Sequence, residues 1–258
     1  NSAIFTDRDL IEEAIKIYGS QSIVASLDVK KDIWGNHEKR VLAIFRLALE
    51  MLQKNQELPQ SEDELNRKLC FFVRYANQQL TISNQGIEWP CMYEANNQPD
   101  ADDSIRAKRE YKRPDFQWGI CDTNETNPER MDKFYTLEAK RLGSPSSSQW
   151  ILNKNYILNG INRFILVEWG YGKSVSSGAM IGYIQNMELR EILNEVNEHC
   201  SQLTIIDLTL SPEGWQNDVS RLDHQLERPD VPPSPFNLRH LWVDLRSKKT
   251  DNNDDTSS

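Results

Sequence analysis

Hydrophobic residues recur every three to four positions over the first eighty residues, which is the spacing of an amphipathic helix. Three segments follow this pattern: 6–19, 36–55 and 61–80. The third opens with Ser61 and Glu64, a capping-box pair, and continues with an apolar stripe made of Leu65, Leu69, Phe72, Ala76 and Leu80. The pattern predicts an N-terminal helical region over 1–60, followed by a helix that begins the main domain.

Beyond residue 113 the pattern changes to the alternation of strands. Two alternating stretches, 115–121 and 133–142, flank a turn-rich segment, so we expect a hairpin with a long connection. A predicted helix over 149–170 places Leu158, Ile161 and Ile165 on one face and Tyr156, Asn159 and Arg163 on the opposite one. A strand over 177–186, a helix over 187–202 and an apolar strand over 203–210 follow. This alternation of strands and helices favours an α/β fold.

The C-terminal part is less regular. Residues 211–236 are rich in proline and are predicted to be mainly loop, whereas 237–246 alternates and is predicted to form a late strand. The tail contains no hydrophobic side chains, which predicts disorder. The chain therefore divides into four expected parts: a helical region over 1–60, a core over 61–210, an extension over 211–246 and a tail over 247–258.

Composition narrows the class of protein. The chain has 258 residues and contains no apolar run long enough to cross a bilayer, so we expect a soluble, cytoplasmic protein with no membrane association. The four cysteines and four histidines are scattered without the spacing of a zinc site or a catalytic triad. A net charge of −9 argues against a protein that coats nucleic acid by bulk attraction.

One local segment runs against that acidic balance. Between residues 104 and 114 five basic side chains accompany a single glutamate: Arg106, Lys108, Arg109, Lys112 and Arg113. A charge run of this kind is usually a solvated loop. Because this run directly precedes Asp115, we also consider it a candidate contact for the phosphates of DNA.

Three charged residues of the predicted hairpin have the chemistry of a catalytic site. Glu138 and Lys140 lie on one face of the second strand, and antiparallel pairing places Asp115 across from Glu138. Two neighbouring carboxylates repel each other unless a cation lies between them, and oxygen ligands suit Mg²⁺ or Mn²⁺. Lys140 would orient or deprotonate a metal-bound water and counter the charge on a scissile phosphate.

The Pro-Asp pair before the first strand and the Glu-Ala-Lys that ends the second resemble the PD-(D/E)xK nuclease superfamily, the restriction-endonuclease-like fold. The resemblance implies a mixed central sheet flanked by helices and metal-dependent cleavage of DNA. It implies that Asp115 and Glu138 ligate Mg²⁺, that Ala139 contributes its backbone carbonyl, and that Lys140 is the catalytic lysine. Element order extends the resemblance over roughly 61–210, but the match in residue identity is confined to these positions.

The resemblance also suggests further site residues. Many members carry an acidic residue on the helix before the sheet, and Glu64 is the best match here, although a capping-box glutamate explains it equally well. Tyr156, Asn159 and Arg163 are expected to face the site and contact DNA, with Arg163 holding a phosphate; the alternative is a plain solvent-facing stripe.

The expected function is that of a Mg²⁺-dependent DNA endonuclease, by analogy an effector of bacterial restriction or antiviral defence. A non-catalytic nucleic-acid-binding or scaffold module of the same fold and an RNA-directed nuclease are the alternatives. Because an acidic chain attracts DNA poorly, we expect a DNA-engaging ATPase or sensor, or self-association, to deliver the substrate. The docking surfaces expected for this partner are the first sixty residues and the late strand over 237–246.

Overall fold

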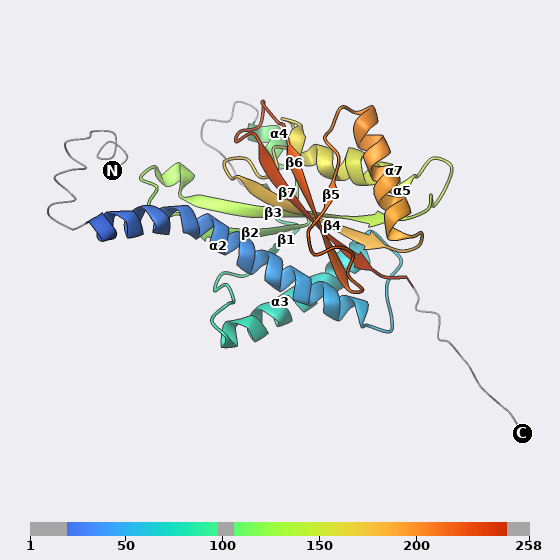
Figure 1. Ribbon diagram of the computed structural model, residues 1–258, viewed down its shortest axis with the longest axis horizontal. Helices are drawn as coiled ribbons and strands as arrows, with labels where there is room; N and C mark the ends of the chain where they lie inside the picture. Colours follow the sequence, from blue (N-terminus) through green and yellow to red (C-terminus); the bar gives the residue numbers. More distant parts are fainter. Residues whose placement is uncertain (1–19, 98–105, 247–258) are drawn as a thin grey trace, which may run out of the picture.

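The computed structural model describes the backbone of residues 20–97 and 106–246, with side chains described from residue 33 in the first range and from residue 108 in the second. The helix predicted over 6–19 and the tail predicted over 247–258 lie outside these residues. Within them the chain forms one mixed, open sheet covered by helices on both faces, which confirms the predicted α/β class (Figure 1).

The sheet contains seven strands in the order β1-β2-β3-β4-β7-β6-β5. Their bounds are β1 Met92–Tyr93, β2 Phe116–Cys121, β3 Asp132–Leu142, β4 Ser177–Ile184, β5 Thr209–Leu210, β6 Val219–Leu226 and β7 Phe236–Asp244. The central strands β3, β4 and β7 are parallel, and each outer pair is antiparallel. The predicted hairpin is confirmed as β2 and β3.

Helices cover the two faces of this sheet. On one side lie α2 (Ser20–Gln53) and α3 (Glu62–Ile82), which pack against each other and against the sheet. The other side carries α7 (Leu189–Gln202) and a segment of three short pieces, α5 (Leu152–Tyr156), the π-helix η3 (Ile157–Ile161) and α6 (Asn162–Ile165). The short α4 (Arg106–Glu110) and the 3₁₀ turn η2 (Pro128–Arg130) complete the set.

The described part of the N-terminal region belongs to the main core. One stripe of α2 is fully buried and packs in the same hydrophobic cluster as α3, β2 and β3; it consists of Val41, Ile44, Phe45, Ala48, Leu49 and Leu52. This apolar stripe is the one that the sequence predicts. Because this stripe supplies part of the core, the described part of α2 belongs to the main domain, whereas the sequence predicts that this domain begins after residue 60.

The predicted late strand is central rather than peripheral. It forms β7, which pairs with β4 on one edge and with β6 on the other. With both edges paired, β7 offers no free edge on which a strand of a partner could add, and it is not dispensable to the sheet as the predicted docking role assumes. The segment 211–246, expected as an extension, therefore supplies part of the central sheet.

Strand β6 was expected to be loop. Its buried positions include Ser220 and His224 beside Leu222 and Leu226, so polar residues occupy places where an alternating pattern shows apolar ones. Residues 203–210 are predicted to form a strand, but only Thr209–Leu210 does so. The turn that caps α7 occupies the start of that segment, where the backbone N–H of Ile205 donates to the carbonyl of Cys200.

The segment predicted as one helix over 149–170 is interrupted by the π-helix η3. A π turn adds a residue to the helical repeat and so rotates everything that follows. The buried face also differs from the predicted one: Leu158, predicted to be on the apolar face, is exposed, while Ile157 and Tyr156, which directly precedes the π turn, are fully buried.

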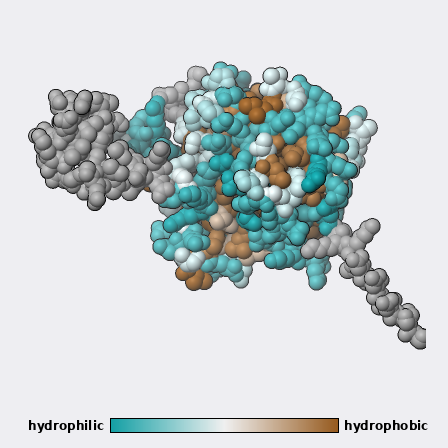
Figure 2. All heavy atoms as spheres, viewed as in Figure 1, coloured by the Kyte–Doolittle hydropathy of each residue, from teal (hydrophilic) through white to brown (hydrophobic). Residues whose placement is uncertain are grey.

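The visible surface agrees with the polar composition of the chain. The face seen in Figure 2 is mostly hydrophilic, with small separated hydrophobic patches. Within the described ranges no helix is both long and apolar enough to cross a membrane.

Candidate active site

The candidate site lies where β3 continues past the start of β2. The register pairs Phe116 with Leu137, so Asp115 lies across from Glu138, as the sequence predicts, and β2 offers no strand partner to residues 138–142. We call residues 138–142 the free edge of β3. Two carboxylates bind its backbone: the N–H of Ala139 donates to Asp115 Oδ2 at 2.7 Å, and the N–H of Arg141 donates to Glu62 Oε2 at 3.1 Å.

The ammonium group of Lys140 lies at the centre of these acidic groups. Its Nζ is 2.8 Å from Glu62 Oε1, from Glu138 Oε1 and from the carbonyl oxygen of Ala139. Asp115 Oδ2 is 4.0 Å from the same nitrogen. We call Glu62, Asp115, Glu138 and Lys140 the acidic cluster. Its members come from α3, the residue before β2, and β3, so the fold joins segments that are distant in the sequence.

Glu138 is the most enclosed member of the cluster. Its residue is 0% exposed, and its Oε1 is bound by both Lys140 and the guanidinium of Arg163. No described residue donates a hydrogen bond to its other oxygen, Oε2, although that atom is buried. A buried carboxylate oxygen without a donor is costly, so this atom is a candidate ligand position.

Electrostatics set the protonation of the cluster. Burial raises the pKa of Asp115 well above its ordinary value, and the charge of Glu138 raises it further, against the opposing effects of Lys140 and the Ala139 N–H. Burial by itself would lower the pKa of Lys140, but Glu138, Asp115 and Glu62 outweigh it and raise that pKa. Lys140 is therefore a protonated cation at neutral pH, and Asp115 takes up a proton more readily than an exposed aspartate does.

Arg163 links the acidic cluster to the basic segment. Its guanidinium lies against the ring of Trp169, 4.3 Å from the ring centroid, and the ammonium of Lys112 lies 3.9 Å from the same centroid. Such contacts between a cation and an aromatic ring are favourable, especially where water is excluded. Lys112 is thus placed near the cluster through two intervening side chains.

The other basic residues of this segment have different environments. The Nε of Arg109 donates to the carbonyl of Val167, and Arg113 Nε donates to Asn96 Oδ1 at 3.1 Å. Lys108 is exposed, and the side chain of Arg106 lies outside the described residues. Arg109 and Lys112 therefore hold the segment against the loop after α6, and Lys108 and Arg113 are the members turned to solvent.

A second arginine, Arg228, holds the backbone at both ends of the loop that follows α6. Arg228 is fully buried, and its guanidinium donates to the carbonyls of Phe164, Tyr171, Gly172 and Val175. Five donors in a rigid plane suit several carbonyls at once. Arg228 thereby fixes the backbone on either side of Trp169, whose ring packs against Arg163.

The acidic residue on α3 differs from the expected one. Glu64 is exposed; its side chain accepts from the hydroxyl of Ser61 at 3.0 Å, and its backbone N–H donates to the same hydroxyl, so it belongs to the N-terminal cap of α3. Glu62, two positions earlier, is the one that reaches Lys140 and Arg141. Two helical positions differ by about 200° around the axis, so the two side chains point in nearly opposite directions. The only sequence signal for Glu62 is its place in the first turn of a helix that precedes the sheet.

The predicted polar face of the helical segment over 149–170 is not formed as expected. Tyr156 is fully buried and its hydroxyl bonds His240 Nδ1 at 2.7 Å, so it cannot contact DNA in this arrangement. Asn159 is exposed and donates to Asn155. Of the three predicted residues, only Arg163 reaches the acidic cluster.

No group of three or more histidine, cysteine, aspartate and glutamate side chains in the described parts of the chain is arranged to hold a metal ion. Mg²⁺ needs fewer protein ligands than this, since it commonly binds one or two carboxylates and keeps several waters. Asp115, the unbonded Oε2 of Glu138 and the carbonyl of Ala139 supply hard oxygen donors of the right kind. The residues present therefore fit a magnesium ion, provided that the Lys140 ammonium gives up part of its present contacts.

Comparison with models of protein families, with curated proteins and with solved structures gave no match for this chain. The geometry of its own residues is thus the basis on which a function is proposed.

Proposed function

We propose that this protein is a metal-dependent nuclease of the PD-(D/E)xK type, with a restriction-endonuclease-like core, that hydrolyses phosphodiester bonds of DNA. The observation that carries the proposal is the convergence of Asp115, Glu138 and Lys140 at the free edge of β3, with Glu62 added from α3. The two carboxylates, the lysine and the intervening backbone carbonyl are the groups that such a reaction needs.

When bound, Mg²⁺ would stabilise the negative charge that develops on the phosphate and lower the pKa of a bound water. Asp115 and Glu138 would hold the ion, with the carbonyl of Ala139 beside them. Lys140, as a protonated amine, would orient the attacking water and balance the charge on the scissile phosphate. Glu62 would hold the Lys140 ammonium in position through its 2.8 Å contact.

Two surfaces suit a polyanionic substrate. Lys108 and Arg113 are exposed on the segment that packs near Arg163, and lysine and arginine are the usual partners of phosphates. On the outer side of α3, Phe71 and Tyr75 are 56% and 52% exposed, and the guanidinium of Arg74 lies 5.7 Å from the Phe71 ring centroid. Exposed rings beside cations can stack the bases of a single strand. These features favour a nucleic acid over a small phosphate ester.

The test is cleavage of plasmid DNA, single-stranded DNA and RNA by the purified chain, with and without Mg²⁺ or Mn²⁺. Asp115→Asn, Glu138→Gln and Lys140→Met are expected to abolish metal-dependent cleavage. Glu64→Gln is the matched control, because Glu64 lies on the same helix as Glu62 but outside the cluster. Cleavage that persists in the three cluster variants would contradict the proposal, as would a complete absence of cleavage of all three substrates.

A second candidate is a non-catalytic nucleic-acid-binding module of the same fold. The observation that favours it is the compensation of Glu138 by both Lys140 and Arg163, which satisfies its charge without a metal. The two functions differ in metal binding. Titration with Mn²⁺ should release heat and raise the melting temperature if the cluster is catalytic, and should do neither if the cluster is only an ion-pair network.

A further inference from the structure

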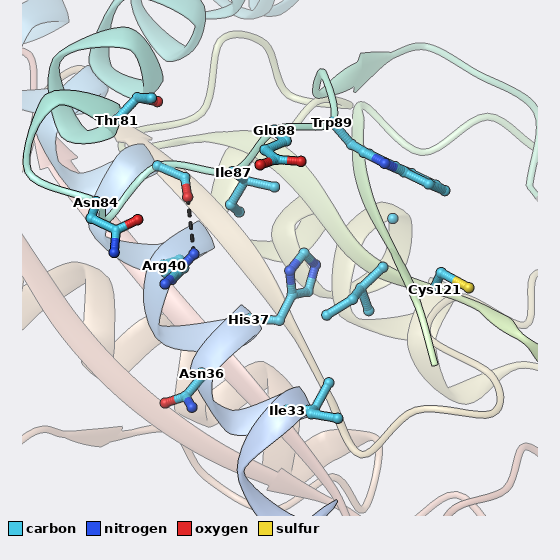
Figure 3. Close-up of a pocket in the computed structure, with 13 residues that line it drawn as sticks. Ile33, Asn36, His37, Arg40, Thr81, Asn84, Ile87, Glu88, Trp89 and Cys121 are labelled. Carbon is cyan, nitrogen blue, oxygen red and sulfur yellow. Dashed lines mark hydrogen bonds between the residues drawn. The ribbon is translucent and has the colours of Figure 1, made fainter. Parts of the chain in front are cut away.

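A cavity of about 380 Å³ lies between α2, the segment that follows α3 and the end of β2 (Figure 3). Its volume falls within the range of small-molecule sites, which is about 300 to 1,000 Å³. Residues 33–40 of α2 form one side, residues 81–89 a second, and residues 119–121 of β2 the third.

The cavity is separate from the acidic cluster. Asp115 precedes β2, whereas Cys121 ends it and lines the cavity. A strand rises about 3.3 Å per residue, so the two ends are roughly 20 Å apart. None of the residues that line the cavity belongs to the cluster.

The walls of the cavity are partly apolar and include one indole ring. Ile33, Ile87 and Ile120 line it together with Trp89, whose side chain is half-exposed. The backbone carbonyl of Trp89 accepts from the indole N–H of Trp118 at 2.7 Å, which fixes the chain that carries the ring. A flat apolar surface held in this way suits an aromatic ligand.

Gly119 keeps part of this space open. A Cβ atom at this position would lie 3.0 Å from the Phe134 ring and 3.5 Å from the Trp89 ring. Any side chain here would therefore reduce the cavity beside the indole ring.

His37 supplies a hydrogen-bonding group of defined character. It is 4% exposed, and its Nε2 lies 3.0 Å from the carbonyl oxygen of Trp118. A carbonyl can only accept, so Nε2 carries the proton. Burial lowers the pKa of His37, and the nearby charge of Arg40 adds to this effect, so the ring is neutral at pH 7. Its Nδ1 then has a lone pair that can accept a hydrogen bond from a donor on a ligand.

The rim carries further polar groups. Arg40 Nη1 donates to the carbonyl of Gly86 at 3.1 Å, which holds the guanidinium at the edge of the cavity. Asn36 lies one turn earlier on the same helix, while Asn84 and Glu88 lie on the opposite side (Figure 3). The lining thus combines a ring, amides that both donate and accept, a neutral imidazole, the Arg40 cation and the Glu88 carboxylate.

We propose that this cavity binds a nucleobase, carried by a nucleoside or a nucleoside monophosphate. The base would stack on Trp89, its edge would pair with His37 and the asparagine amides, and the phosphate would contact Arg40. Two sources share this chemistry, a free nucleotide and an unpaired base of a nucleic-acid strand. The proposal does not depend on cleavage of DNA by the acidic cluster.

The experiment is isothermal titration of the full chain with AMP, GMP, CMP and UMP in the absence of divalent metal, with ribose 5-phosphate as a probe that lacks a base. At least one monophosphate is expected to bind, and ribose 5-phosphate is not. Trp89→Ala and Gly119→Val should each weaken the binding at least ~5-fold, the change that corresponds to the lower end of the stacking contribution of ~1–3 kcal/mol per base. Trp150→Ala is the matched control, because this indole is equally exposed but lies outside the cavity.

Two further arms refine the result. Adenosine compared with AMP, and Arg40→Ala compared with the parent chain, measure the contribution of the phosphate. If an oligonucleotide of five nucleotides binds ~10-fold more tightly than its monomer, the ligand is an unpaired base of a strand. Equal or weaker binding would identify a free nucleotide as the ligand. Absence of binding by all four monophosphates at 10 mM would overturn the proposal, as would binding that Trp89→Ala and Gly119→Val leave unchanged.

Discussion

Glu62 Oε1 lies 2.8 Å from Lys140 Nζ, although 78 positions separate the two residues. The contact exists because α3 begins beside the free edge of β3, where the other oxygen of Glu62 binds the Arg141 N–H. One carboxylate thus fixes both the backbone of the edge and the side chain that extends from it. The first turn of α3 is thereby part of the acidic cluster.

Glu62→Gln is expected to lower the rate of metal-dependent cleavage at least ~10-fold, since Lys140 would lose a charged contact of the kind worth ~1.5–3 kcal/mol. Glu64→Gln should leave the rate within ~2-fold and cost less than ~1 kcal/mol of stability through the cap. Single-turnover cleavage and thermal unfolding of both variants are the measurements. Equal rates for the two variants would remove Glu62 from the site.

Arg163→Ala is expected to destabilise the fold by ~3 kcal/mol, because it leaves the buried Glu138 with Lys140 as its only cationic partner among the described residues. Adding Glu138→Gln to this variant should recover part of the loss, since the uncompensated charge is then removed. Urea unfolding of the single and double variants measures the coupling between the two residues. Additive losses in the double variant would mean that the pair is not coupled.

Asp115→Asn is expected to raise the melting temperature at pH 7 while it abolishes cleavage. The folded-state pKa of Asp115 is raised, so its ionised form destabilises the native state as pH rises through that pKa. Asparagine keeps an oxygen that can accept from the Ala139 N–H and carries no charge. The difference between variant and parent should shrink as pH falls and disappear below pH 3.8, the ordinary pKa of the carboxyl, where it becomes protonated in both states. A scan of melting temperature against pH checks the trend, and a variant that is less stable at pH 7 would refute it.

Acid should destabilise the protein below pH 6.5 through its buried histidines. Burial lowers the pKa of His224 to about 4 and that of His240 well below its ordinary value. As pH falls from 6.5 to 4 the unfolded chain takes up protons that the native state does not, and each histidine lowers the free energy of unfolding by up to ~1.4 kcal/mol per pH unit. Urea unfolding at pH 7, 6 and 5 measures this slope.

His224→Gln should make that slope shallower, since glutamine can donate to the Ile206 carbonyl that His224 now bonds. His199→Gln is the control, because His199 lies on α7 away from the pair formed by His224 and His240. A slope that is the same in the parent chain and in His224→Gln would show that another group governs the acid response.

The sequence predicts those features that depend on local spacing. Alternation and a turn-rich connection are enough to predict the β2–β3 hairpin, and antiparallel pairing then places Asp115 opposite Glu138. The buried stripes of α2 and α3 follow from helical periodicity in the same way. The metal ligation and catalysis that the motif implies stay predictions.

Features that depend on packing between distant segments were missed. Glu62 and Glu64 are both glutamates in the first turn of α3, so the sequence does not show which of them reaches Lys140. The way in which α3 approaches β3 determines that it is Glu62. The burial of Tyr156, at the end of α5, has no spacing signal, because it depends on core partners from a distant strand, His240 and Trp242, which bond its hydroxyl. The central position of β7 likewise reflects pairing partners and not its place in the sequence.

The free edge of β3 also bears on solubility. A strand edge with unpaired N–H groups is a template on which a strand of another molecule can add. Here Asp115 and Glu62 bind the N–H groups of Ala139 and Arg141, and so remove the donors that an incoming strand would use. These two carboxylates of the candidate active site thus also prevent other strands from adding to the sheet. A chain that lacks both would expose an edge on which its own copies could associate.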